Sequence, residues 1–253
     1  MTPDELSARQ LESRAGRRFC PTQNETVAAT PALFASEPMI KLYYYPGNAS
    51  LAVHILLEEL GVPFKLDLVD RANSAHKSPE YLKLNPNGLI PVLVDGDLVL
   101  YESVAICMHL ADTHPEAGLA PALGTPERAH FYKWFVWCSN TLQAMLMHYF
   151  YGDRMVDDGD VAAATQVKAH AEARIGPMLD QLDAQLAAHG RDWLLGASYS
   201  AVDPFAMLMC RWTRGFARPA RSLPHLGPYL QRMLARPAVA RAFATEKLQP
   251  PLV

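Results

Sequence analysis

The chain has 253 residues, half of them hydrophobic and 19% charged, which is enough for one or two domains with a sizeable buried core. Its formal net charge of −3 argues against nucleic acid as an electrostatic partner. It contains no run of about 18 apolar residues, so the sequence predicts no membrane-spanning helix.

The first 38 residues differ in composition from the rest of the chain. They are polar, and a weakly apolar stretch near their end is interrupted by Pro31. This pattern does not match the clean apolar region of a secretory signal. We expect residues 1–38 to be a disordered extension, or the product of an upstream start before a true beginning near Met39.

The cysteines indicate a reducing compartment. None of them forms a C-x-x-C pair, and three lie among apolar residues of expected helices. Buried, reduced thiols of this kind are typical of a cytoplasmic protein. No His/Cys cluster has the spacing of metal ligands, so we expect no metal site. The four cysteines are Cys20, Cys107, Cys138 and Cys210.

Residues 39–114 are predicted to form a small mixed sheet with helices packed against it. Alternating and helical apolar spacings define most of its elements. Pro79 suits the first position of a short helix, and Asp95-Gly96-Asp97 is a hairpin signal. In chain order, the expected elements are strand 40–45, helix 51–60, strand 64–69, helix 79–84, strands 91–94 and 98–101, and helix 102–114.

After a linker rich in Pro, Gly and Ala at 115–124, the rest of the chain (125–253) is predicted to be all helical. One apolar stripe runs from Phe131 to Tyr149 at helical spacing, and a second long helix is expected at 161–188. Ser200-x-x-Asp203 has the arrangement of a capping box, with Asp in place of the usual Glu. Shorter helices are expected near 225–235 and 238–245.

The segment 85–93 is the most informative stretch of the chain. An Asn-Pro-x-Gly turn leads into an apolar strand that begins with Pro91, a residue that cannot donate to a sheet. Bonds that precede proline are the ones that readily become cis. A cis bond here would turn the backbone of Ile90 outward, where its N–H and C=O can pair with a peptide-like ligand.

These features together resemble the cytosolic glutathione S-transferases over residues 40–246. The bacterial beta class is the nearest match. The resemblance implies a thioredoxin-like α/β domain (βαβαββα) followed by an all-α domain, glutathione as co-substrate, and a homodimer. Four segments carry it: the first loop, from Tyr44 to Gly47; segment 85–93; Glu102-Ser103; and 193–203, which ends in the capping box.

The resemblance implies a binding role for several residues. Ser103, at the start of a helix, offers its hydroxyl, its N–H and the positive helix end to the α-carboxylate of glutathione. Glu102 can take the ammonium group, and Ile90 beside Pro91 would bind through its backbone. His76 and Lys77 can meet the glycine carboxylate, although a solvated loop is an equally good interpretation of these two.

The sequence departs from the family where the thiol is activated. Ala49 stands where the beta class has a cysteine, and Asn48 stands where serine-type relatives have a hydroxyl. Ser50 and Asn48 remain as catalytic candidates, with Tyr44 or Tyr45 as less favoured donors; Ser50 can alternatively be a helix N-cap. One hydrogen bond to a charged group contributes about 1.5–3 kcal/mol, and lowering a thiol pKa by about two units needs roughly 2.7 kcal/mol. A single donor therefore suffices.

The second substrate is expected between the two domains. Aromatic and polar residues there suit a small apolar electrophile, although a dimer or interhelical contact explains them equally well. An arginine cluster after the third helix of the helical part is either solvated or favours an acidic co-substrate. The pocket candidates are Tyr45, Trp137, Asn140, Thr141 and His148. The arginines are Arg211, Arg214, Arg218 and Arg221.

From these residues we expect a glutathione transferase that conjugates the glutathione thiolate to a small, mostly apolar electrophile. Two alternatives stay open. The first is a glutathione-dependent reductase of disulfides or peroxides. The second is a non-catalytic glutathione-binding protein with the same fold, which Asn48 and Ala49 favour.

Overall fold

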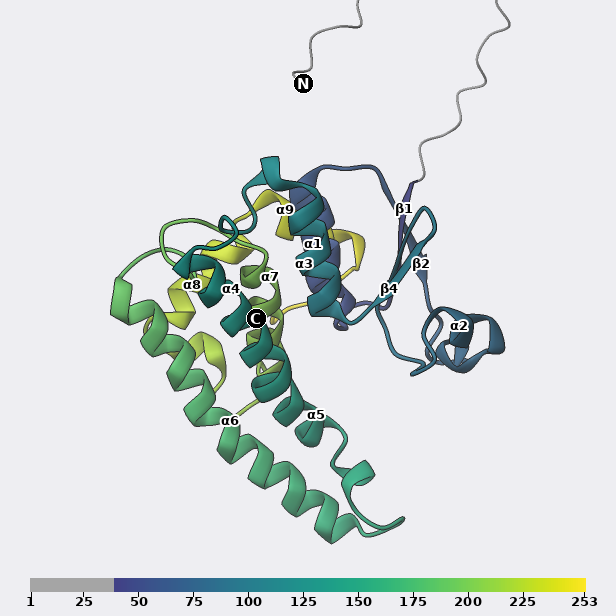
Figure 1. Cartoon of the computed structure of the whole chain (residues 1–253). Helices are drawn as coiled ribbons and strands as arrows, with labels where there is room; N and C mark the ends of the chain where they lie inside the picture. The colour runs from purple at the N-terminus through teal and green to yellow at the C-terminus, as the bar shows by residue number, and fades with distance from the viewer. Residues whose placement is uncertain (1–38) are drawn as a thin grey trace, which may run out of the picture. The chain divides into compact units, whose positions relative to one another are not determined.

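The computed structural model describes residues 39–253, and the predicted extension lies outside them. A four-stranded mixed sheet with its helices comes first, and only helices follow it in the described part of the chain (Figure 1). The predicted fold class, an α/β domain in the order βαβαββα followed by an all-α domain, is therefore confirmed. No helix between residues 39 and 253 is long and apolar enough to cross a membrane.

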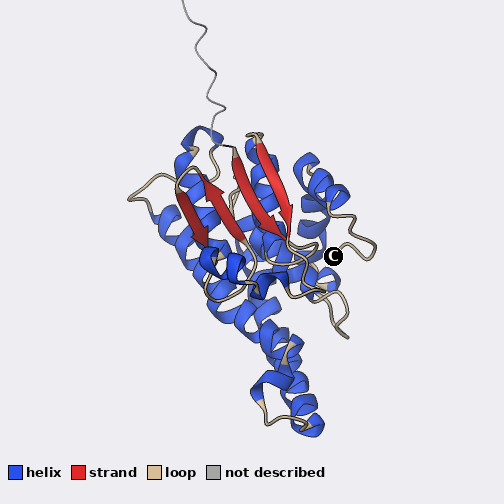
Figure 2. Ribbon diagram, turned by 90° about the vertical axis from the view of Figure 1, so that its right-hand side faces the viewer, coloured by secondary structure: helices blue, strands red, loops and turns tan. Residues whose placement is uncertain are grey.

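The sheet has the strand order β2-β1-β3-β4 (Figure 2). β1 pairs with β2 in parallel, and β3 pairs antiparallel with both β1 and β4. Because side chains alternate along a strand, Leu42 and Tyr44 face one core, while Tyr43 faces a second cluster with Ile90 and Val92. The strands are β1 (Ile40–Tyr44), β2 (Phe64–Leu68), β3 (Val92–Asp95) and β4 (Leu98–Tyr101).

Two helices cover the face of the sheet that is turned toward the helical domain, and α2 lies on the other side (Figure 1). α1 (Ser50–Leu60) packs against α3 (Ser103–Thr113) and also against the helices α7 and α9 of the helical domain. α2 (Pro79–Leu84) begins as predicted, with Pro79 in its first turn and the Ser78 hydroxyl accepting from Tyr81 N. The short 3-10 helix η1 (Ala75–Lys77) precedes it.

The apolar stripe of the helical domain is buried, but the helix that carries it is not uniform. A π-helical segment, η3, separates two α-helices, and π segments occur frequently at functional sites. The further elements are η2 (Pro115–Ala117), α4 (Pro126–Trp137), η3 (Cys138–Gln143), α5 (Ala144–Phe150), η4 (Gly152–Met155), α6 (Val161–His189), α7 (Val202–Trp212), η5 (Ala220–Ser222), α8 (Leu226–Leu234) and α9 (Pro237–Thr245).

The predicted capping box at the start of α7 is half right. The carboxylate of Asp203 accepts from Ser200 N at 2.8 Å, as expected, but the Ser200 hydroxyl donates to the same carboxylate at 3.2 Å. Asp203 also accepts from Leu194 N at 3.0 Å and from the Tyr229 hydroxyl at 3.1 Å. Its complete burial raises its pKa, and these hydrogen bonds oppose that rise. Asp203 therefore ties the 193–196 loop to α7 and α8.

Asp183 on α6 holds the start of α8, and this contact predicts an acid-sensitive stability. Its carboxylate accepts from the N–H groups of His225 and Leu226, each at 2.8 Å. Burial raises the pKa of Asp183, but hydrogen bonds from His225 and Leu226 outweigh burial and lower it. A lowered pKa means that the ionised carboxylate stabilises the fold above its ordinary pKa, and that this stabilisation is lost as the pH falls through the lowered value.

We therefore expect Asp183→Asn to lower the free energy of unfolding by about 1.5–3 kcal/mol near neutral pH. The difference between the variant and the parent should narrow as the pH falls through the lowered pKa of Asp183, because the parent then loses the same charge. Urea unfolding at several pH values measures this. A difference that does not change with pH would contradict the role of the carboxylate charge.

Candidate functional site

The backbone at Ile90 is open to a ligand. The Ile90–Pro91 bond is cis, as the sequence predicted, and pairing within β3 begins only at Val92. Neither the N–H nor the C=O of Ile90 makes a hydrogen bond to another residue of the described chain. The preceding carbonyl, that of Leu89, accepts from the Tyr81 hydroxyl at 2.8 Å and from Asn85 Nδ2 at 2.9 Å. The Leu89–Ile90 peptide is thus anchored through its carbonyl, while the N–H and C=O groups of Ile90 make no hydrogen bond within the described chain.

The glycine of the Asn-Pro-Asn-Gly turn brings η1 against this segment. Gly88 has a φ of +59°, and a Cβ there would lie 2.8 Å from the His76 carbonyl oxygen and 2.7 Å from Lys77 Nζ. Lys77 Nζ donates to the Asn87 carbonyl at 3.2 Å. The two residues proposed for the glycine carboxylate therefore lie beside the turn that leads to Ile90. A side chain at position 88 would push them away.

His76 lies in a positive environment. Burial lowers its pKa, and so do the charges of Lys77, Arg71 and Arg154, in that order. Its Nδ1 is buried and has no hydrogen-bond partner among the described residues. A neutral imidazole with an unused nitrogen can accept or donate one hydrogen bond, according to its tautomer. His76 can therefore contact a ligand without carrying a charge itself.

Glu102 and Ser103 form the other end of the candidate site. Ser103 is the first residue of α3, and its hydroxyl makes no hydrogen bond within residues 39–253. A free hydroxyl and the positive end of an eleven-residue helix together suit a carboxylate. Glu102 is exposed and has a φ of +74°, a conformation that residues other than glycine rarely adopt. Strain of this kind concentrates at ligand-binding sites.

The structure argues against Ser50 as the thiolate donor. Its side chain is fully buried, and its hydroxyl donates to Tyr45 O at 3.1 Å and accepts from Tyr45 N at 3.2 Å. Nor is Ser50 the N-cap, because α1 begins at Ser50 and Ala49 takes that position. The hydroxyl is instead used to fix the loop before α1. The spacing in the sequence could not reveal this, because it does not show which way the side chain points.

Asn48 keeps a free donor at the start of α1. It is half-buried, and its Oδ1 accepts from Ala49 N. The Nδ2 group has no partner among the described residues. The Ser50 N–H at the start of α1 also has no partner among the described residues, whereas Leu51 N donates to Asn48 O at 2.9 Å. A thiolate placed here would meet Asn48 Nδ2 and the positive end of α1.

This arrangement predicts different outcomes for Asn48 and Ser50. We expect Asn48→Ala to raise the thiol pKa of bound glutathione by about one unit or more, since one hydrogen bond to a charged group contributes about 1.5–3 kcal/mol. Ser50→Ala should instead lower stability by about 1–3 kcal/mol and leave that pKa unchanged. The thiolate absorbance as a function of pH measures the first effect. A raised thiol pKa in Ser50→Ala alone would restore Ser50 as the donor.

No sequence pattern indicates the residues of the helical domain that hold the first loop. Gly47 N donates to Glu246 Oε2 at 2.7 Å, and Trp212 Nε1 donates to Gly47 O at 3.1 Å. Glu246 is almost completely buried, and its other oxygen is 2.8 Å from Nδ1 of the buried His54. Both backbone polar groups of Gly47 are thus bound by residues of the C-terminal part. No spacing pattern links positions this far apart in the chain.

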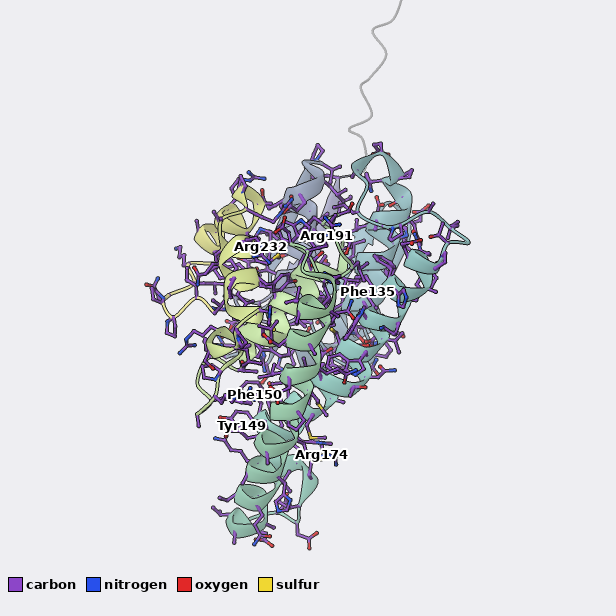
Figure 3. All side chains as sticks on the ribbon, turned by 90° about the vertical axis from the view of Figure 1, so that its left-hand side faces the viewer. Phe135, Tyr149, Phe150, Arg174, Arg191 and Arg232 are labelled. Carbon is purple, nitrogen blue, oxygen red and sulfur yellow. The ribbon has the colours of Figure 1, made fainter. Side chains whose placement is uncertain are left out.

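The pocket candidates do not all gather in one place. The Tyr45 ring packs near Ile90, beneath the guanidinium of Arg71, in the cluster that includes Tyr81 of α2. Trp137 packs edge to face on Trp134, with ring centroids 5.3 Å apart. The other candidates lie along η3 and α5, where Asn140 is exposed and Thr141 is half-buried. His148 lines a hollow of about 400 Å³ between α5 and α6. The lining of this hollow includes Arg174, which is labelled in Figure 3.

The arginine cluster after α7 is engaged within the fold. Arg211 is almost fully buried and donates to the carbonyls of Pro251 and Leu252. Burial lowers the pKa of Arg211 to about 10, and the charge of Arg214 adds to this. Arg221 donates to Val253 O at 2.9 Å. Arg211 and Arg221 thus fix residues 251–253, while Arg218 pairs with Asp180. Arg214, Arg218 and Arg221 are exposed, in agreement with the solvated interpretation.

Comparison with known proteins identifies related sequences and structures. The family model "Glutathione S-transferase, N-terminal domain" matches residues 38–112, and "Glutathione S-transferase, C-terminal domain" matches residues 133–246. Glutathione S-transferase GST-4.5 of Xanthomonas campestris is 33% identical over 211 residues, which cover 83% of this chain and all of the relative. Glutathione S-transferase 3 of Zea mays is 32% identical, with 84% and 96% covered.

Two solved structures have the same fold over most of this chain. The glutathione S-transferase from Xylella fastidiosa superposes with a TM-score of 0.74 at 32% identity, covering 83% of this chain and all of the other. A glutathione transferase homologue from Sulfitobacter, with bound glutathione, has a TM-score of 0.75 at 27% identity and the same coverage. Within residues 39–253, no three His, Cys, Asp or Glu side chains gather closely enough to hold a metal ion.

Proposed function

The chain belongs to the glutathione S-transferase family, and from this premise we propose that it joins the sulfur of glutathione to a small, mostly apolar electrophile. The observation that carries the proposal is the unpaired backbone of Ile90, which lies between a free Ser103 hydroxyl and the His76–Lys77 pair. An extended tripeptide has its own N–H and C=O at the cysteine, and these can pair with Ile90 as an added strand does.

The ends of the tripeptide have matching partners in the proposed complex. The γ-glutamyl carboxylate would accept from the Ser103 hydroxyl and N–H at the start of α3, with Glu102 near the ammonium group. The glycine carboxylate would meet Lys77, with neutral His76 as a hydrogen-bond partner. Two anchored ends and a paired middle restrict the position of the thiol, which accounts for much of the advantage of an enzyme in a bimolecular reaction.

The chemical step requires the thiolate. The thiol proton leaves to water, the sulfur attacks the electrophilic carbon, and a carbon–sulfur bond forms while the leaving group departs with its electron pair. Asn48 Nδ2 and the N-terminus of α1 would stabilise the thiolate before attack. No side chain has to change its covalent state in this scheme.

Ala49 and the engaged hydroxyl of Ser50 favour the non-catalytic alternative, since positions 48–50 then offer no thiol and no free hydroxyl. The Asn48 amide argues against it. Reduction of disulfides or peroxides through bound glutathione needs the same binding residues. The choice between these functions therefore depends on whether the protein activates the sulfur of bound glutathione, because all three functions need the same tripeptide-binding residues.

Turnover with 1-chloro-2,4-dinitrobenzene tests the transferase proposal, with calorimetry of glutathione binding in parallel. We expect saturable binding, a bound thiol that ionises below the pH at which free glutathione does, and release of chloride. Binding without a shifted thiol pKa and without turnover would leave only the non-catalytic alternative. Absence of binding would overturn all three functions.

The family resemblance also supports a homodimer, and the three buried free thiols support a cytoplasmic location. Sedimentation equilibrium tests the dimer, since a protein that stays monomeric at micromolar concentration would contradict it. Fractionation of the source cells tests the location.

A further inference from the structure

Two arginines from different parts of the chain both contact Tyr151, and one of them also lies over the ring of Tyr45. The guanidinium of Arg71, in the loop after β2, lies 5.2 Å from the centroid of the Tyr45 ring and 3.5 Å from the Tyr151 hydroxyl. The guanidinium of Arg154, in η4, lies 4.0 Å from the centroid of the Tyr151 ring. The chain of contacts Tyr45–Arg71–Tyr151–Arg154 therefore crosses from the sheet domain to the helical domain.

Neither arginine has a carboxylate partner in the described chain. Other arginines do: Arg128 pairs with Asp112, Arg236 with Glu59 and Arg241 with Glu58. The acidic residues adjacent to these two arginines in the sequence, Asp70 and Asp153, form no ion pair with them. Asp70 accepts two hydrogen bonds from Asn73, at 3.1 and 2.6 Å, and exposed Asp153 lies more than 4.0 Å from any basic side chain.

The charges of Arg71 and Arg154 add to that of Lys77. All three cations act on His76, so they surround one region of the molecule. Like charges that gather without counter-charges disfavour the compact state and favour an anion between them. The glycine carboxylate of glutathione accounts for one anion, beside Lys77 and His76. The guanidinium on the Tyr45 side has no ion-pair partner among the described residues.

This remaining charge lies where the second substrate has to approach. Tyr45 lies in the loop that leads into α1, and its ring shares a cluster with Ile90. A guanidinium that stacks on a tyrosine keeps its N–H edge free for a planar carboxylate, and the ring faces offer a flat apolar surface. The site is thus suited to an aromatic body that carries an acidic group.

We propose that Arg71 and Arg154 form an anion-binding pair that selects, as the second substrate, a small aromatic electrophile bearing a carboxylate. The inference rests on the proposed transferase function, because it names the substrate class of that same site. It refines the expectation of a mostly apolar electrophile by adding one negative charge. It also assigns the acidic preference to these two arginines and not to the cluster after α7.

A matched pair of electrophiles tests the proposal. 4-Chloro-3,5-dinitrobenzoate and 4-chloro-3,5-dinitrobenzamide react at the same carbon and differ in charge; in both, the carbon–sulfur bond forms and chloride leaves with the electron pair. With kcat/KM divided by the uncatalysed rate of each compound, we expect the parent to prefer the benzoate. Arg154→Gln should reduce this preference about tenfold, and added salt should reduce it in the parent.

Arg191→Gln, after α6, is the control, since it removes another exposed arginine without an ion pair among the described residues and should leave the preference unchanged. An unchanged preference in both Arg154→Gln and Arg71→Gln would overturn the proposal. So would a rise in the KM for glutathione alone, because the pair would then serve the glycine carboxylate.

A binding measurement separates this inference from the transferase function. With S-methylglutathione present, 3,5-dinitrobenzoate should bind more tightly than 3,5-dinitrobenzamide, and Arg154→Gln should remove the difference. That result without turnover would mean that the transferase function fails while the anion site stands. Equal binding of the two compounds by the parent would overturn the anion site, whether or not the parent turns over.

Discussion

Ser103→Ala is expected to weaken glutathione binding by about 10- to 100-fold while leaving the fold unchanged. The hydroxyl makes no hydrogen bond within the described chain, so removing it leaves no protein group without a partner. In the proposed complex it donates to a carboxylate, and such charge-assisted bonds contribute about 1.5–3 kcal/mol, which corresponds to that range of affinity. Calorimetric titration of glutathione measures the change.

A matched serine provides the control. The Ser222 hydroxyl donates to the Pro219 carbonyl at 2.7 Å on an exposed turn of the helical domain. Ser222→Ala should therefore leave the affinity for glutathione as it is. If Ser103→Ala bound glutathione as tightly as the parent does, the γ-glutamyl end would have to lie elsewhere, and the proposed orientation of the tripeptide would be wrong.

Glu246→Ala is expected to lower the free energy of unfolding by about 3–5 kcal/mol, the largest loss of stability that we predict. The substitution removes the acceptor of Gly47 N–H and the partner of His54, both in the interior. Buried polar groups without partners are costly. Because Gly47 belongs to the loop that leads into α1, kcat should fall as well. Urea unfolding and turnover at saturating substrate measure the two effects.

Glu246→Gln separates charge from hydrogen bonding. Its oxygen can still accept from Gly47 N–H, and its amide can donate to Nδ1 of a His54 that carries its proton on Nε2. We expect this variant to lose much less stability than the alanine variant. Arg218→Ala, which removes an exposed pair with Asp180, should cost only about 0–1 kcal/mol. If Glu246→Ala cost no more than Arg218→Ala, the loop would not depend on this contact.

Local chemistry made the sheet domain and segment 85–93 predictable. Pro91 at the entry to a strand, Gly88 in a turn and Pro79 at the start of a helix each restrict the backbone, and the structure has the expected conformations at all three places, with β3 beginning one residue later, at Val92. The supports behind the segment, Tyr81 and Asn85, were missed. An Asn before proline is a known turn residue, so Asn85 could have been identified from the sequence.

The first loop could not be predicted in the same way. Whether the Ser50 hydroxyl faces a ligand or its own backbone depends on the direction of one side chain, which spacing does not determine. Glu246, Trp212 and Arg154 reach the candidate site only through the packing of the helical domain on the sheet domain. The π-helical turn in the stripe was also missed, because its apolar residues keep a spacing that an α-helix would share.

The burial of α1 limits how far this protein can be divided into modules. Every residue from Ser50 to Leu57 is buried, and α7 and α9 cover the side of α1 that the sheet does not. A fragment ending after α3 would expose that side to water and would be prone to aggregate. A chimera that takes its helical domain from a relative would need matching residues on both helices. The glutathione-binding half is therefore not an independent folding unit, and we expect both halves to unfold in one transition.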